Sequence, residues 1–82
     1  MKNNILLEEM GDWFLVTYFI DGKSVARVPI NSEDRLIRYV VHDATDFKDG
    51  VEVSNRLTGG LRGITDAILA SKENVSFDYQ SR

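Results

Sequence analysis

The sequence predicts one α+β domain: an antiparallel sheet of three strands, with a fourth strand left open, and two helices packed on one face of the sheet. The chain has 82 residues, the size of a single domain spanning residues 1–82. Hydrophobic residues make up 43% of it, which is typical of a compact globule. Aromatic and β-branched residues fill the first part, whereas the second part repeats apolar residues at helical spacing.

Three consecutive strands are expected over residues 5–10, 13–20 and 23–30. Asp21-Gly22 joins the last two strands and fits a two-residue type I′ turn, because Gly tolerates positive φ and Asp tolerates the left-handed region. Pro29 has no N–H to donate, so the third strand is expected to end there or to lie at an edge.

A two-residue turn fixes which side chains of this hairpin share a face. One face is expected beneath the helices and carries Trp13, Leu15, Phe19, Ala26, Val28 and Ile30. The other carries Phe14, Val16, Tyr18, Ile20 and Val25, with Lys23 and Arg27 at its rim. A shift of one residue in the pairing would exchange the two sets.

Helical spacing follows the hairpin. The spacing of the apolar residues favours an amphipathic helix over a strand, although Val40-Val41 keeps the strand alternative open. These residues are Leu36, Ile37, Val40, Val41, Ala44 and Phe47. Asn31 or Ser32 is expected to cap this helix.

The remainder of the chain predicts a loop-rich connection and a second helix. The connection covers residues 48–60, and the helix begins after Gly60 and ends near Lys72. Arg62 and Asp66 are four residues apart on its outer side, where a weak ion pair is expected. Residues 74–82 form either a short strand or a frayed tail.

Composition excludes several classes of protein. There is no cysteine, so thiolate chemistry and disulfides are absent. The net charge of −3 shows no basic excess, and no nucleic-acid binding is expected. No signal peptide and no apolar run long enough for a membrane span are present, so a cytoplasmic location is expected.

Two motifs suggest metal binding or catalysis and are interpreted as structural. His42, Asp43, Asp46 and Asp49 are spaced unlike a calcium loop, and they are expected to form a solvated helix end without a metal. His42 is the single histidine, and no nucleophile motif accompanies it. Neither an enzymatic activity nor a cofactor is expected.

Residues 56–63, "RLTGGLRG", place glycines between arginines before a helix. Such a loop could bind phosphate through its backbone N–H groups, but it lacks both the Walker and the dinucleotide patterns. A phosphate-binding module is therefore a third hypothesis. Glycosylation of Asn74, which lies in the sequon "NVS", is discounted because no secretory signal accompanies it.

The second apolar face of the hairpin is the predicted contact surface. It consists of Phe14, Val16, Tyr18, Ile20, Val25 and Arg27. An exposed apolar patch with aromatic and arginine side chains is typical of protein interfaces. The alternatives are that another element of the chain covers this face, or that a second copy of the chain does so in a homo-oligomer. The double substitution Tyr18→Ala/Val16→Asp distinguishes a contact surface, which would stay folded, from a core, which would not.

Residues 32–41 and 59–74 resemble the C-terminal half of a family of small phage proteins that inhibit the type I-F CRISPR surveillance complex. The matching positions are Ser32, Leu36, Tyr39, Gly60, Leu61, Ile64, Ala67, Glu73 and Asn74. The resemblance implies a sheet followed by two helices. It also implies a non-enzymatic inhibitor in the host cytoplasm that docks on a CRISPR effector complex and blocks the pairing of guide and target. It carries over no contact residue, because the strands do not align.

Overall fold

The computed structural model describes residues 2–78, which form five strands and two helices. The elements follow one another as β1 (Asn3–Glu9), β2 (Phe14–Ile20), β3 (Lys23–Ile30), α1 (Glu33–Asp46), β4 (Val51–Asn55), α2 (Gly59–Ala70) and β5 (Val75–Phe77). The α+β class is confirmed, and the final strand, which the sequence left open, is β5; residues 79–82 of that predicted segment lie outside the described residues. No helix of the described residues has the length and apolar character needed to cross a membrane.

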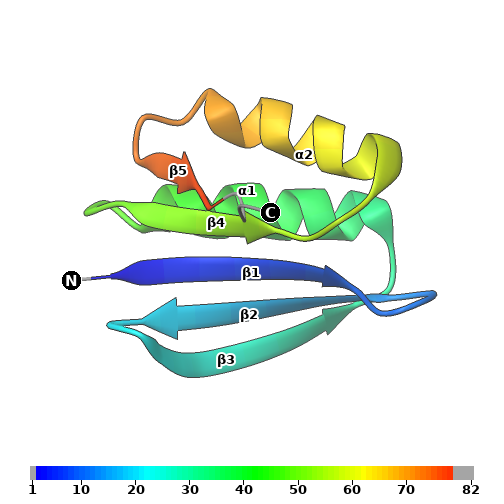
Figure 1. Cartoon of the computed structure of the whole chain (residues 1–82), viewed down its shortest axis with the longest axis horizontal. Coiled ribbons are helices and arrows are strands. Elements are labelled where there is room, and N and C mark those ends of the chain that lie inside the picture. Colours follow the sequence, from blue (N-terminus) through cyan, green and yellow to red (C-terminus); the bar gives the residue numbers. More distant parts are fainter. Residues whose placement is uncertain (1, 79–82) are drawn as a thin grey trace.

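The strands form one mixed sheet in the order β3-β2-β1-β4-β5 (Figure 1). β1, β2 and β3 pair antiparallel, whereas β4 pairs parallel with both β1 and β5. The prediction of a purely antiparallel sheet was therefore wrong. Parallel neighbours need a long crossover connection, which α2 supplies between β4 and β5, while α1 carries the chain from β3 past β2 and β1 to β4.

β4 replaces the loop-rich connection that the sequence predicted. Its Val51 and Val53 are buried in the core, while Glu52 between them is only partly buried. Ser54 and Asn55, which end the strand, are buried as well, so β4 is covered on both faces at that end. β4 is also central in the sheet, because its backbone pairs with β1 on one side and with β5 on the other.

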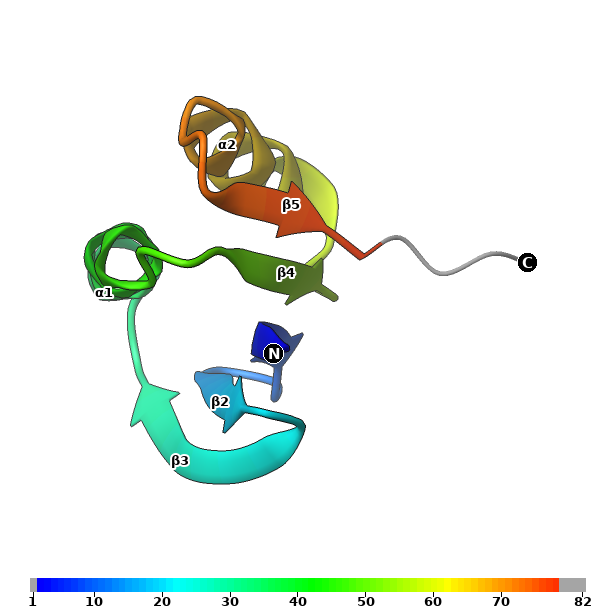
Figure 2. The ribbon, with the colours of Figure 1, turned by 90° about the vertical axis from the view of Figure 1, so that its left-hand side faces the viewer.

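Both helices lie on the same side of the sheet (Figure 2). Crossovers of one hand that move in one direction along a sheet place their helices on one face. Leu36, Val40 and Ala44 of α1 join Leu69 of α2 in a single core cluster with the strands. Ser32 caps α1 as predicted, since its hydroxyl accepts the backbone N–H of Arg35 at 3.2 Å.

The hairpin turn is confirmed, but the pairing beyond it is not. Asp21 and Gly22 both adopt positive φ, 54° and 80°, as a type I′ turn requires. Phe19 then pairs with Ser24, but Tyr18 pairs with Ala26, so Val25 is left out of the ladder as a bulge. An extra residue in one strand changes which side chains of the two strands share a face.

The bulge reverses the predicted assignment of β2. Phe14, Val16 and Tyr18 lie in the core, paired with or beside Ile30 and Val28. Trp13 and Ala26 are exposed and Phe19 is half-buried, so their assignment to the core was wrong. Leu15 is buried, but it lies outside the core cluster, on the opposite face of β2. The assignment of Val28 and Ile30 to the core is confirmed.

Candidate functional site

The predicted contact surface does not exist as one face. Phe14, Val16 and Tyr18 are 8%, 0% and 7% exposed, so they cannot serve as anchors for a partner. Ile20 and Val25 are exposed, as is Arg27. Their pairing separates them, however. Ile20 has the parity of Tyr18 and faces the helix side, whereas Arg27 pairs with Thr17 and faces the other way. A binding role for these three residues stays a prediction.

Tyr18 instead connects the sheet to α1. Its hydroxyl donates a hydrogen bond to the Oδ2 atom of Asp43. Burial raises the pKa of the Tyr18 hydroxyl well above its ordinary value, and the hydrogen bond to Asp43 and the charge of that carboxylate add to the effect. The pair therefore holds α1 in register over β2 and fixes the orientation of Asp43.

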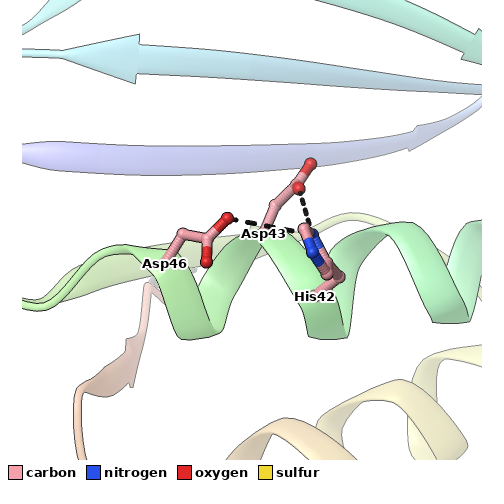
Figure 3. A group of neighbouring side chains, drawn as sticks. All are labelled: His42, Asp43 and Asp46. Carbon is pink, nitrogen blue, oxygen red and sulfur yellow. Dashed lines mark hydrogen bonds and ion pairs between the residues drawn. The ribbon is translucent and has the colours of Figure 1, made fainter.

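Asp43 belongs to a small cluster with His42 and Asp46 on α1 (Figure 3). The Nδ1 atom of His42 lies 3.1 Å from Oδ1 of Asp43 and 3.8 Å from Oδ2 of Asp46. The hydrogen bond with Asp43, together with the negative charges of Asp46 and Asp43, raises the pKa of His42. The side chains of His42 and Asp46 are 75% and 69% exposed, which agrees with a solvated helix end.

The cluster is also the group of described side chains that could hold a divalent cation, through one imidazole nitrogen and two carboxylate oxygens within 4.8 Å of one another. Each of these groups already has a partner. Asp43 accepts the Tyr18 hydroxyl, and His42 lies between the two carboxylates. The contacts within α1 and with Tyr18 account for the arrangement. Asp49, which the sequence grouped with these residues, lies beyond the helix in a turn and is not part of the cluster.

Two hollows in the surface lie along α1 and share one residue, Arg35. The first has a volume of about 490 Å³ and is lined by Arg35, Arg38, Tyr39, His42 and Asp43. The second has a volume of about 470 Å³ and is lined by Trp13, Pro29, Ile30, Asn31 and Arg35. We call the two together the α1 groove. The turn between β1 and β2, the end of β3 and the exposed side of α1 thus meet at one surface.

Two large aromatic side chains of the α1 groove are exposed to solvent. Trp13 is 39% exposed and Tyr39 is 42% exposed. Sequence reasoning missed both, because Trp13 was assigned to the core and Tyr39 was used only for the family resemblance. The spacing of Arg35, Arg38, Tyr39 and His42 at three and four residues places them on one side of a helix, and this was a readable signal. No comparable signal marked Trp13, which adjoins an apolar strand.

Acidic side chains of the same chain contact the loop before α2 and the arginines on either side of its glycines. The carboxylate of Glu9 accepts the backbone N–H of Thr58 at 2.6 Å and its hydroxyl at 2.8 Å, and these bonds lower the pKa of Glu9. Arg56 pairs with Asp78 at 3.4 Å, and Arg62 pairs with Asp66 at 3.8 Å, as expected. Thr58 and both arginines of this loop thus already contact acidic side chains. α2 begins at Gly59, two residues before the expected start at Leu61, and ends at Ala70, close to the expected end near Lys72.

The Asn74 side chain binds the C-terminal end of α1. Its side-chain amide donates to the carbonyl oxygens of Ala44 at 2.8 Å and Phe47 at 2.7 Å, which are acceptors at the end of α1. These bonds satisfy carbonyls that a helix end leaves without partners. The amide nitrogen of the sequon is therefore engaged in holding α1 to the segment before β5.

No protein-family model matches the chain, and comparison with curated proteins and with solved structures gave no match. The function is therefore inferred from the geometry of the α1 groove.

Proposed function

We propose that the chain is a protein-binding domain without enzymatic activity, and that it contacts its partner through the α1 groove. The observation that carries this proposal is the meeting of Trp13, Arg35 and Tyr39 at two adjoining hollows. Tryptophan, tyrosine and arginine are the residue types that dominate the energy of protein interfaces.

The exposure of these side chains supports the proposal. A chain of 82 residues has a small core, and leaving a tryptophan and a tyrosine about 40% open forgoes burial that would stabilise the fold. The Tyr39 ring needs no burial to keep α1 in place, because Leu36, Val40 and Ala44 on the other side of the helix provide its packing. A contact with another molecule would bury both rings.

A partner seated in the α1 groove would act by occlusion. The family resemblance extends the proposal to a phage-encoded inhibitor of a host protein or nucleoprotein complex, with a CRISPR effector as the partner. This extension stays a prediction. The predicted sheet-face docking is replaced here by docking along α1, because the aromatic side chains assigned to the sheet face are buried.

Self-association is the second candidate, and one observation favours it. Neither helix lies on the face of the sheet that carries Leu6 and Phe19, which are only partly buried (Figure 2). A second copy could bury this face in a homo-oligomer.

The test compares three tagged forms of the chain in lysate of the cells that express it. These are the unmodified chain, the groove variant Trp13→Ser/Tyr39→Ala and the hairpin variant Val25→Ser/Arg27→Ala. All replaced side chains are exposed, so circular dichroism should show three folded proteins. We expect the unmodified chain and the hairpin variant to retain the same partner, and the groove variant to lose it.

Three results would contradict the proposal. Equal retention by both variants would remove the α1 groove from the interface. Loss in the hairpin variant alone would return the contact to Val25 and Arg27. Retention of nothing but the untagged chain, with a dimer in sedimentation, would establish the homo-oligomer instead.

A further inference from the structure

We propose that the α1 groove accepts an acidic segment of the partner, with a carboxylate paired to Arg35 between Trp13 and Tyr39. This inference rests on the proposed function and names the chemistry of the partner.

Most charged side chains in the α1 groove are already paired within the chain. Arg38 is paired with Asp34 at 2.9 Å on α1. His42 lies between Asp43 and Asp46, and Asp43 also accepts the hydroxyl of Tyr18 from the sheet. Arg35 lines both hollows and makes no ion pair within residues 2–78. It is therefore the positive charge that the groove offers to a ligand.

The guanidinium of Arg35 has a geometry that suits a carboxylate. Its planar fork of N–H donors matches a carboxylate with two parallel hydrogen bonds. The backbone N–H of Arg35 is bound by the Ser32 cap, so its position at the start of α1 is fixed while its side chain is exposed. A carboxylate that approaches Arg35 would meet an exposed guanidinium carried by a fixed stretch of backbone.

Apolar surface lies on either side of Arg35. Trp13, Pro29 and Ile30 line the second hollow, and the Tyr39 ring lines the first. A segment that carries apolar or aromatic residues next to its carboxylate would bury these groups and exclude water from the ion pair. The whole chain has a net charge of −3, so it has no general attraction for acidic segments, and binding of such a segment would depend on Arg35.

The test uses the fluorescence of Trp13, the single tryptophan of the chain. The folded chain is titrated with a random copolymer of glutamate and tyrosine, and separately with a copolymer of lysine and tyrosine, under excitation selective for tryptophan. The first should change the Trp13 emission in a saturable way, and the second should not. Added salt should weaken the response, because an exposed ion pair is screened.

Three variants locate the interaction. Arg35→Ala should weaken binding of the acidic copolymer by about tenfold or more, because a hydrogen-bonded charge is removed. Arg35→Lys should lie between that variant and the unmodified chain, because it keeps the charge but loses the planar fork. Arg27→Ala is the matched control on the other face of the sheet and should bind as the unmodified chain does.

The inference is overturned if both copolymers change the emission equally, if neither does, or if Arg35→Ala binds the acidic copolymer as well as Arg27→Ala does. The proposed function would survive these results wherever a partner is still lost on the groove variant Trp13→Ser/Tyr39→Ala. Conversely, retention of the partner by that variant would refute the proposed function even if Arg35 binds the copolymer.

Discussion

The two faces of β2 differ in what covers them, although both are rich in apolar residues. Phe14, Val16 and Tyr18 face α1 and α2 and belong to the core. Leu15 and Thr17 face the other way and are 7% and 5% exposed, although neither helix covers them. Their partners in the neighbouring strands are Glu8 and Pro29 for Leu15, and Arg27 for Thr17. Burial alone thus does not show which face of a strand is the core.

The difference between the faces depends on one residue. Regular pairing from the Asp21-Gly22 turn would place Trp13, Leu15 and Phe19 under the helices. The bulge at Val25 shifts the ladder by one residue on β3 and lets Val16 pair with Val28 in the core. Substitutions on the two faces of β2 should therefore have very different effects on stability.

Val16→Asp should abolish folding. Val16 is 0% exposed, and a carboxylate there would be buried without a partner, which costs several kcal/mol. A domain of this size has a stability on the order of 4–12 kcal/mol. Circular dichroism and urea denaturation measure the loss. Val25→Asp is the matched control, since Val25 is 56% exposed and should change stability by about 0.5 kcal/mol or less.

A substitution at Val16 also tests whether the predicted contact surface exists. Tyr18→Ala/Val16→Asp was expected to leave the fold intact if those residues contact a partner. The structure implies that the double variant unfolds. A folded double variant would show that the helices cover the other face of β2.

Tyr18→Phe should destabilise the chain by about 1.5–3 kcal/mol, because Asp43 loses a hydrogen bond donated to its charge. The pH dependence gives a second test. The pKa of Tyr18 is raised from its ordinary value of about 10, so the folded state holds this proton more tightly than the unfolded state does. The stabilisation is complete below pH 10 and is lost as the pH rises above it.

Denaturation of the unmodified chain and of Tyr18→Phe should therefore converge at alkaline pH. Parallel stability curves for the two proteins above pH 10 would show that the Tyr18 hydroxyl has no buried partner. Tyr39→Phe is a suitable control, since the Tyr39 side chain is 42% exposed.

Deletion of Val25 should cost no more than about 1–2 kcal/mol, because it removes a residue that the ladder leaves unpaired. The hairpin would become regular while Val16 stays in the core, and nuclear Overhauser contacts between Val16 and Val28 should persist. Had the pairing been regular from the start, the same deletion would exchange the two faces of β3 beyond the turn and move Val28 and Ile30 out of the core.

The smallest effect is expected at His42. Its pKa is raised above the ordinary value of about 6.5, so its stabilising contact is complete below that pH and is lost as the pH rises through the raised pKa. An NMR titration of the imidazole should show the raised pKa, and Asp46→Asn should lower it. An unchanged pKa in Asp46→Asn would remove Asp46 from the cluster.

Local chemistry was sufficient to predict part of the fold. The Asp21-Gly22 turn, the bounds of β3 and the Ser32 cap of α1 depend on a few neighbouring residues, and all are confirmed. The bulge could not be predicted, because no glycine or other local signal marks Val25. The parallel pairing of β4 depends on long-range crossovers, although the alternation of Val51 and Val53 was a readable sign of a strand.

The candidate site was predictable to a lesser extent. Arg35 and Tyr39 are four residues apart, and a helical projection places them together on the exposed side of α1. Their meeting with Trp13 follows from the return of the chain through β2 and β3, which no local pattern shows. The predicted anchors Phe14, Val16 and Tyr18 failed because a surface assignment in a hairpin depends entirely on register.

An NMR spectrum of the labelled chain with its co-purified partner shows directly whether the α1 groove is the interface. The single indole N–H signal of Trp13 and the amide signals of Arg35 and Tyr39 should shift or broaden, while those of Val25 and Arg27 stay unchanged. Shifts at Val25 and Arg27 with an unchanged Trp13 signal would contradict the proposed function, because the partner would then bind the hairpin and leave the α1 groove free.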